Sequence, residues 1–165
     1  MPKWGKADFG ELKELQERLL EMEKQADEFC RVAARVLAGR LLDRVIRDTP
    51  VGNYPVSSGK SGGTLKRGWV AQTHEEAASG SGTPTAQKAK AYAMSLPVTK
   101  CGDTYTIEVI NPVEYASYVE FGHRTVNGGV VKGQYFLTTA EAVVDNKKEQ
   151  ILQAELTKFL KQYFS

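Results

Sequence analysis

Residues 8–50 read DFGELKELQERLLEMEKQADEFCRVAARVLAGRLLDRVIRDTP, and they predict one long helix over residues 8–48. Apolar side chains recur along this segment at alternating steps of three and four residues, and no proline interrupts them. The recurring positions are Leu12, Leu15, Leu19, Met22, Ala26, Phe29, Ala33 and Val36. Asp8 is suited to cap the first turn, and Pro50 disfavours helix at the residue before it. So long an apolar stripe can lie across its own domain or pack partly against a neighbouring subunit.

The middle of the chain, residues 64–111, predicts an antiparallel sheet of three or more strands. The strands are expected at Leu65–Thr73, Leu96–Lys100 and Tyr105–Ile110, the last two forming a hairpin. Trp69 is the obvious core candidate of the first strand. A low-complexity run at about 74–95, rich in Ala, Ser, Gly and Thr, predicts a flexible insertion between the strands.

The C-terminal third predicts two further helices. The first is short, spans 113–122 and ends at Gly122, and a glycine-rich loop follows it to Gly133. The second spans 134–164 and is expected to pack on the sheet. The order of helix, strands, short helix and helix predicts an α+β fold in a single domain of residues 1–165.

Composition excludes several classes of protein. The formal net charge is only +2, which is a weak field for a dedicated nucleic-acid binder. No apolar run is long enough to cross a bilayer and no leader segment begins the chain, so we expect no membrane contact and synthesis in the host cytoplasm. Cys30 and Cys101 are far apart in sequence, and we expect two reduced, mostly buried thiols.

The chemical motifs do not indicate an enzyme, a cofactor or a small-molecule substrate. Gly59-Lys60-Ser61 resembles the end of a phosphate-binding loop, but Tyr54 stands where that motif needs glycine. The histidines His74 and His123 lack the spacing of metal ligands. Glu114 and Glu120 are carboxylates that could serve as an acid and a base, but nothing else in the sequence distinguishes them from other surface carboxylates. The sequence predicts surface positions for both. No catalytic, metal or cofactor-binding residue is therefore predicted.

A nucleic-acid-binding module is the alternative. The middle segment interleaves basic and aromatic residues, as surfaces that bind nucleic acids often do. These residues are Lys66, Arg67, Trp69, Lys88, Lys90 and Tyr92. However, Trp69 also fits a core position, and the long first helix mixes both signs of charge instead of gathering positive charge on one face.

Four landmarks resemble a known family. They are Thr49–Gly52, Gly63–Trp69, Tyr115–His123 and Gln134–Leu137, of which Tyr115–His123, reading YASYVEFGH, is the most specific. In order and spacing they are similar to the tail-component family of long-tailed phages and prophages, named after the gene-ten product of the Hong Kong 97 type of phage. The longer loop at Asn53–Gly62 departs from the family pattern.

The resemblance implies a non-enzymatic structural subunit of the virion tail or neck. Such subunits join head and tail, complete or terminate the tail, or connect to the portal, as self-assembled rings. A sixfold ring is the expectation for tail completion, and a twelvefold ring would suit a portal-side adaptor. The implied partners are further copies of the chain, tail-tube proteins and head-connector proteins, with passive contact to DNA passing through the ring.

The candidate partner-interface residues belong to the most specific landmark and its next residue. They are Tyr115, Tyr118, Val119, Phe121, Gly122, His123 and Arg124. Aromatic and arginine side chains are frequent anchors of protein interfaces, which favours this segment as a docking surface. The alternative is that Tyr115 and Tyr118 only pack the short helix onto the sheet.

Overall fold

The computed structural model describes residues 9–58 and 62–164. The long helix α1 runs from Gly10 to Asp48, which confirms the predicted helix over the described residues. It ends where Thr49 turns extended, and both the amide and the hydroxyl of Thr49 donate to the carbonyl of Val45, at 2.8 and 2.6 Å. The predicted cap Asp8 and the Gly59-Lys60-Ser61 segment lie outside the described residues.

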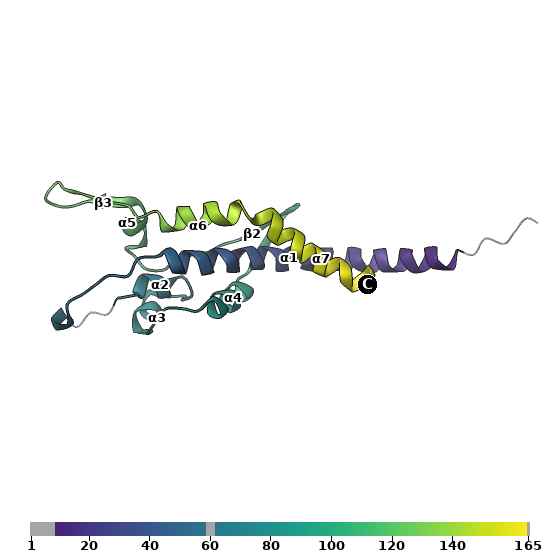
Figure 1. The fold of residues 1–165 in the computed structure, drawn as a ribbon, viewed down its shortest axis with the longest axis horizontal. Helices are drawn as coiled ribbons and strands as arrows, with labels where there is room; N and C mark the ends of the chain where they lie inside the picture. Colours follow the sequence, from purple (N-terminus) through teal and green to yellow (C-terminus); the bar gives the residue numbers. More distant parts are fainter. Residues whose placement is uncertain (1–8, 59–61, 165) are drawn as a thin grey trace, which may run out of the picture.

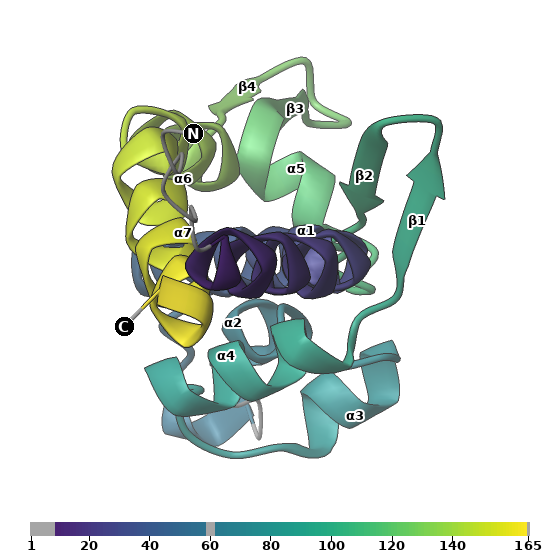
Figure 2. The same cartoon turned by 90° about the vertical axis from the view of Figure 1, so that its right-hand side faces the viewer.

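The other elements pack along α1 from about Arg18 to its C-terminal end (Figures 1 and 2). The helices are α2 (Thr64–Gly68), α3 (His74–Ser79), α4 (Ala86–Ser95), α5 (Ala116–Phe121), α6 (Phe136–Asp145) and α7 (Lys148–Phe164), with a 3₁₀ turn at Val56–Ser58. Seen along α1, the helices α2, α3 and α4 lie on one side, and α6 with α7 covers another (Figure 2). Leu42 and Val45 of α1 are fully buried between them, so the core sits around the C-terminal half of the helix.

The predicted sheet of three or more strands is wrong. The described residues form two separate two-stranded antiparallel sheets. In one, β1 (Val98–Cys101) pairs with β2 (Thr104–Ile107), which confirms the predicted hairpin. In the other, β3 (Gly122–Arg124) pairs with β4 (Val130–Lys132), inside the segment predicted as a loop. The fold is therefore mostly helical.

The segment predicted as the first strand, Leu65–Thr73, instead begins in helix α2. Leu65 and Trp69 are four residues apart, so a helical turn places both on the face toward the core, and both are buried. The prediction of Trp69 as a core residue is confirmed, although it follows a helix. The run at 74–95 forms α3 and α4, whose first turns are capped by the hydroxyls of Thr73 and Thr85.

The predicted C-terminal helix is two helices, and neither packs on a sheet. The helix is interrupted at Asn146 and Lys147, between α6 and α7, and both helices lie along α1. The rings of Phe29 in α1 and Phe159 in α7 stack at 4.7 Å between centroids. This part of the apolar stripe of α1 is therefore covered by α7 of the same chain.

Gly39 lies in α1 where the helix α4 crosses it closely. An added Cβ would lie 3.5 Å from Cβ of Ala93 and 3.6 Å from Cα of Lys90, which is ordinary contact. We predict that Gly39→Ala raises the free energy of unfolding by about 1 kcal/mol, because alanine costs less backbone entropy in a helix. Urea unfolding followed by circular dichroism measures the change.

The control for this prediction is Gly68→Ala. There an added Cβ would collide with the side chain of Asn111 and lie 2.9 Å from Cγ2 of Val113, so we expect a loss of stability. If both variants were destabilised alike, the α1–α4 crossing would be tighter than described.

Asp27 fastens the β1–β2 hairpin to α1. Lys100 and Tyr105 of the hairpin donate to Oδ1 of Asp27 at 2.6 and 2.7 Å, and Nε of Arg31 donates to Oδ2 at 2.8 Å. Arg31 also donates to the carbonyl of Val98 at 2.8 Å. This polar cluster joins the hairpin to the helix, in addition to the apolar packing of Val98 and Ile107.

The attachment of the hairpin is predicted to depend on pH. Hydrogen bonds from Lys100, then Tyr105, then Arg31 hold the pKa of Asp27 far below its ordinary value of 3.8. A depressed carboxyl pKa stabilises the folded state above the unfolded pKa, and this contribution is lost as the pH falls. We expect β1–β2 amide shifts in NMR spectra to move as the pH drops below 3.8. Asp27→Asn should abolish that movement, and an unchanged titration in the variant would rule out Asp27 as its cause.

The cysteines and the membrane question can be compared with the predictions. Both thiols are free, as predicted, but Cys101 is exposed and Cys30 only half-buried, so the prediction of mostly buried thiols is wrong. Within the described part of the chain, no helix has the length and apolar character needed to span a bilayer.

Candidate functional site

The four sequence landmarks meet beyond the C-terminal end of α1. Nε1 of Trp69 donates to Oγ1 of Thr49 at 2.9 Å, which joins the first two landmarks. The ring of Phe136, in the fourth landmark, packs edge-on against the Trp69 ring of the second, with 6.2 Å between the ring centroids. The backbone amide of Gln134, in the fourth landmark, donates to the carbonyl of Val119, in the third, at 3.0 Å. Residues far apart in sequence therefore form one region.

Arg67 of the second landmark is buried and holds a loop together. Its guanidinium donates to the carbonyls of Ala77 at 2.7 Å, Gly62 at 3.2 Å and Gly82 at 3.5 Å, and to Oγ1 of Thr64 at 3.3 Å. No carboxylate pairs with it among the described residues. Arg67 and the buried Trp69 are thus unavailable to nucleic acid, which removes two residues from the alternative predicted for this segment.

Glu120 of the third landmark caps the helix α6. It is only 3% exposed, so its predicted surface position is wrong. Its carboxylate accepts the amides of Leu137 and Thr138, each at 2.9 Å, and the hydroxyl of Thr138 at 2.7 Å. The N-cap residue Tyr135 supplies no side-chain cap of its own. A negative charge at this helix end is favourable, so Glu120 is a structural residue that joins α5 to α6.

Gly122 lets the two flanking segments approach closely. Its φ is +81°, and an added Cβ would collide with the carbonyl of Val131 and lie 2.6 Å from the amide nitrogen of Gly133. Only glycine fits there without strain. Glu120 and Gly122 of the landmark are therefore explained by packing, and the exposed Tyr118 and Phe121 are not.

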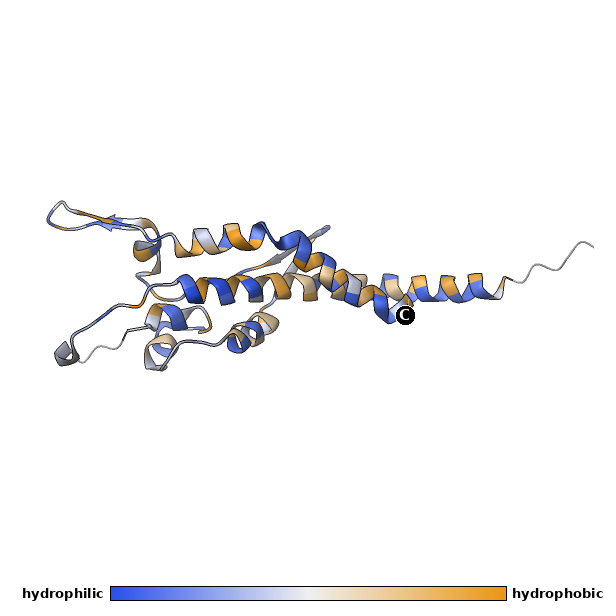
Figure 3. Cartoon of the chain, viewed as in Figure 1, coloured by the Kyte–Doolittle hydropathy of each residue, from blue (hydrophilic) through white to orange (hydrophobic). Residues whose placement is uncertain are grey.

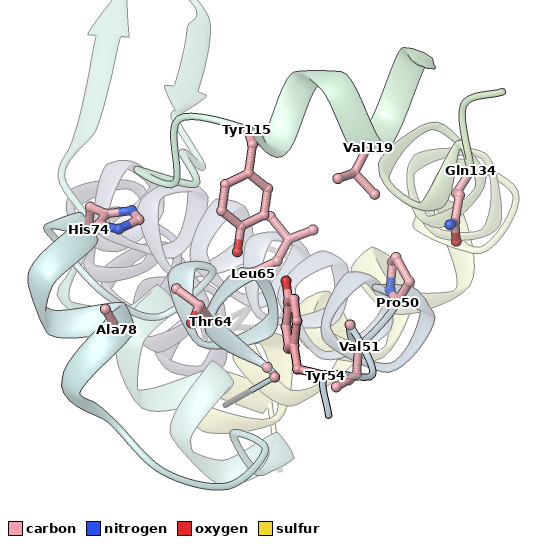
Figure 4. Close-up of a pocket in the computed structure, with 13 residues that line it drawn as sticks. Pro50, Val51, Tyr54, Thr64, Leu65, His74, Ala78, Tyr115, Val119 and Gln134 are labelled. Atoms are coloured by element: carbon pink, nitrogen blue, oxygen red, sulfur yellow. The ribbon is translucent and has the colours of Figure 1, made fainter. Parts of the chain in front are cut away.

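A cleft of about 660 Å³ opens among the landmarks (Figure 4). It is lined by Pro50, Val51, Gly52, Tyr54, Gly62, Gly63, Thr64, Leu65, His74, Ala78, Tyr115, Val119 and Gln134. The hydroxyls of Tyr54 and Tyr115 point toward its middle. Burial raises the pKa of Tyr115 above its ordinary value, so this hydroxyl stays protonated at neutral pH. Nδ1 of His74 is shielded and has no hydrogen-bond partner among the described residues.

The cleft has the composition of a recognition surface. Its described lining contains no carboxylate, cysteine, lysine or arginine, and its polar side chains are those of Tyr54, Thr64, His74, Tyr115 and Gln134. In the part of the chain that the structure describes, no group of three or more His, Cys, Asp and Glu side chains could hold a metal ion. Tyrosines and apolar residues around a cleft can instead receive a protein segment.

The predicted interface residues divide between the cleft and the surface. Tyr115 and Val119 line the cleft. Tyr118 and Phe121 are exposed on α5, and the ring of Tyr118 meets that of His123 edge-on at 5.6 Å. Arg124 is exposed on β3, and Gly122 is half-buried. Tyr118 therefore touches β3 through His123 and is also 58% exposed, so its side chain is open to a partner.

Sequence reasoning missed several residues of the region. Tyr54, Thr64 and His74 were not predicted to line a cleft, and Glu120 was not predicted to be buried. Thr64 lies within the second landmark, so a grouping of the landmarks in space could have found it. For Tyr54 and His74 the sequence contains no comparable signal.

These features define a class: a mainly helical protein built on one long helix, with aromatic and apolar side chains exposed at its ends. Residues 13–122 match the model of a family described as "Bacteriophage HK97-gp10, putative tail-component". Because the match covers more than half of the chain, the protein belongs to this family of phage tail components. No curated protein and no solved structure matches the chain.

Membership confirms the predicted family and implies a structural role in the phage tail instead of an enzymatic one. The matched residues end at Gly122 and include the first two landmarks and all of the third except His123. The fourth, Gln134–Leu137, lies beyond the match. It is nevertheless joined to the matched part by the carboxylate of Glu120.

Proposed function

We propose that the protein is a ring-forming subunit of the phage neck or tail end, which joins head and tail or completes the tail through protein–protein contacts. The observation that carries this proposal is a pair of uncovered apolar surfaces on one chain. One follows the N-terminal part of α1, where Leu12 is 60% exposed. The other lies at α5 and β3–β4, where Phe121 is 64% exposed.

Two different surfaces are what a cyclic ring requires. In such a ring each subunit presents one patch to the preceding copy and another patch to the next. Large apolar surfaces on a single chain commonly mark interaction sites. Tail-tube and head-connector proteins would contact the remaining faces, and the predicted segment Tyr115–Arg124 is the favoured docking surface.

The test is a double variant, Tyr118→Ala with Phe121→Ala, in the full chain. Both side chains are exposed, so the variant should fold, and we expect it to lose ring assembly and to fail to restore infectivity to a phage that lacks this gene. Sedimentation velocity measures the assembled mass, and negative-stain images count the subunits, six for tail completion and twelve for an adaptor.

The matched control is Met94→Ala, which removes an exposed apolar side chain from α4, away from this surface. It should assemble and complement like the unaltered protein. Full infectivity of the double variant would count against the Tyr115–Arg124 surface. Failure of the unaltered chain to restore joined particles would count against the neck or tail-end role.

A further inference from the structure

The two exposed apolar surfaces lie at opposite ends of the long axis of the molecule (Figures 1 and 3). We define the helix tip as residues 9–24 and the hairpin tip as residues 121–135. The outer part of the helix tip, before Arg18, projects beyond the end of α7, and the hairpin tip contains β3 and β4. One chain cannot bring them together, so any contact between them joins two copies.

The helix tip continues a packing seam whose intramolecular partner ends. Phe29 of α1 is covered by Phe159 of α7, but α7 ends near Arg18, where Nη1 of Arg18 lies 3.5 Å from the carbonyl of Tyr163. Leu12 and Leu15, further along the same heptad face, are exposed. The seam is therefore apolar throughout and is only partly covered within the chain.

The two tips carry opposite charge. The helix tip has five glutamates against three lysines and arginines, which gives a net charge of 3 − 5 = −2. The hairpin tip has Arg124 and Lys132 and no acidic residue, which gives +2 with His123 neutral. In the described part of the chain neither Arg124 nor Lys132 makes an ion pair, and in the helix tip only Glu21 among the glutamates does, with Lys24.

From this complementarity we infer that the helix tip of one copy docks on the hairpin tip of the next copy, head to tail. The inference rests on the proposed ring. Pairing two helix tips would bring −2 against −2, and pairing two hairpin tips would bring +2 against +2. Both symmetric contacts are thus opposed by charge, whereas the head-to-tail contact is favoured by it and buries apolar side chains on both partners.

Disulfide cross-linking tests the contact. On a Cys30→Ser, Cys101→Ser background, a chain with Leu15→Cys is mixed with a chain with Val130→Cys and oxidised. We expect a heterodimer, because a disulfide needs Cα atoms within about 7 Å. Each chain oxidised alone should stay uncross-linked. Glu17→Cys, on the opposite face of the helix, is the matched control and should not cross-link to Val130→Cys.

Charge reversal adds an independent readout. Arg124→Glu with Lys132→Glu should abolish the heterodimer and the assembled species, since like charges then face each other. Glu11 and Glu23 flank the apolar seam, and Glu11→Lys with Glu23→Lys in the partner chain should restore both. The restored pairing should weaken at high salt, as exposed charge pairs do.

The outcomes separate this inference from the proposed function. If rings form but the Leu15–Val130 cross-link does not, the proposed contact is overturned and the proposed ring is still supported. A heterotypic cross-link without rings supports the contact and counts against the ring. If the chain neither assembles nor cross-links at the highest concentration that stays in solution, both are overturned.

Discussion

Glu120→Ala is expected to lower the free energy of unfolding by about 2–4 kcal/mol. The carboxylate is buried and accepts three hydrogen bonds from the first turn of α6. Alanine would leave the amides of Leu137 and Thr138 without their acceptor and would remove the negative charge from this helix end. Urea unfolding followed by circular dichroism measures the loss.

Two further variants make the test specific. Glu120→Gln keeps the shape of the side chain and one acceptor oxygen, so it should lose about half as much stability. Glu114→Ala removes an exposed carboxylate from the same segment and should change stability by less than about 0.5 kcal/mol. If Glu120→Ala were as mild as Glu114→Ala, the link between α5 and α6 would not depend on this carboxylate.

The long helix could be predicted because its signal is strong and local. The apolar period runs without a break from Leu12 to Val36, and Pro50 marks the end. The β1–β2 hairpin was also within reach, since Gly102 adopts the positive φ of a tight turn between alternating residues. In both places the sequence pattern and the local structure agree without help from distant residues.

The middle of the chain was predicted wrongly because tertiary contacts outweigh a weak pattern there. Leu65–Thr73 has apolar and aromatic residues that suit a strand, yet the four-residue spacing of Leu65 and Trp69 suits a helical turn equally well. Two helix-capping residues, Thr73 just before the low-complexity run at 74–95 and Thr85 within it, were overlooked in the prediction of this segment. Thr73 with Glu76 even has capping-box spacing, which was the better evidence.

The candidate site shows what a linear motif leaves undecided. Tyr115–His123 was recognised as a unit, but its members play different parts: Glu120 caps α6, Gly122 permits close packing, and Tyr118 and Phe121 face solvent. The partners that separate these roles, such as Thr138 and Gly133, lie more than ten residues away in a segment predicted as loop and helix. Only their position in space distinguishes a structural residue from an exposed one.

Trp69→Ala is expected to lower the free energy of unfolding by about 3–5 kcal/mol. The indole is 3% exposed, packs edge-on against Phe136 and donates to Thr49 at the end of α1. Removing it would open a large cavity at the point where three landmarks meet and leave Oγ1 of Thr49 without its donor. Thermal and urea unfolding measure the loss, and the variant should still show helical circular dichroism at low temperature.

A double-mutant cycle separates the hydrogen bond from the volume of the ring. Trp69→Phe keeps an aromatic ring but loses the N–H donor, and Thr49→Val loses the acceptor at nearly constant shape. Trp69→Phe leaves the Thr49 hydroxyl with only its bond to the carbonyl of Val45, and Thr49→Val leaves the indole N–H without its acceptor. The double variant removes both groups, so the sum of the two single losses should exceed the loss in the double variant by about 1 kcal/mol. Additive losses would mean that Thr49 and Trp69 contribute independently, and that packing alone ties the second landmark to the end of α1.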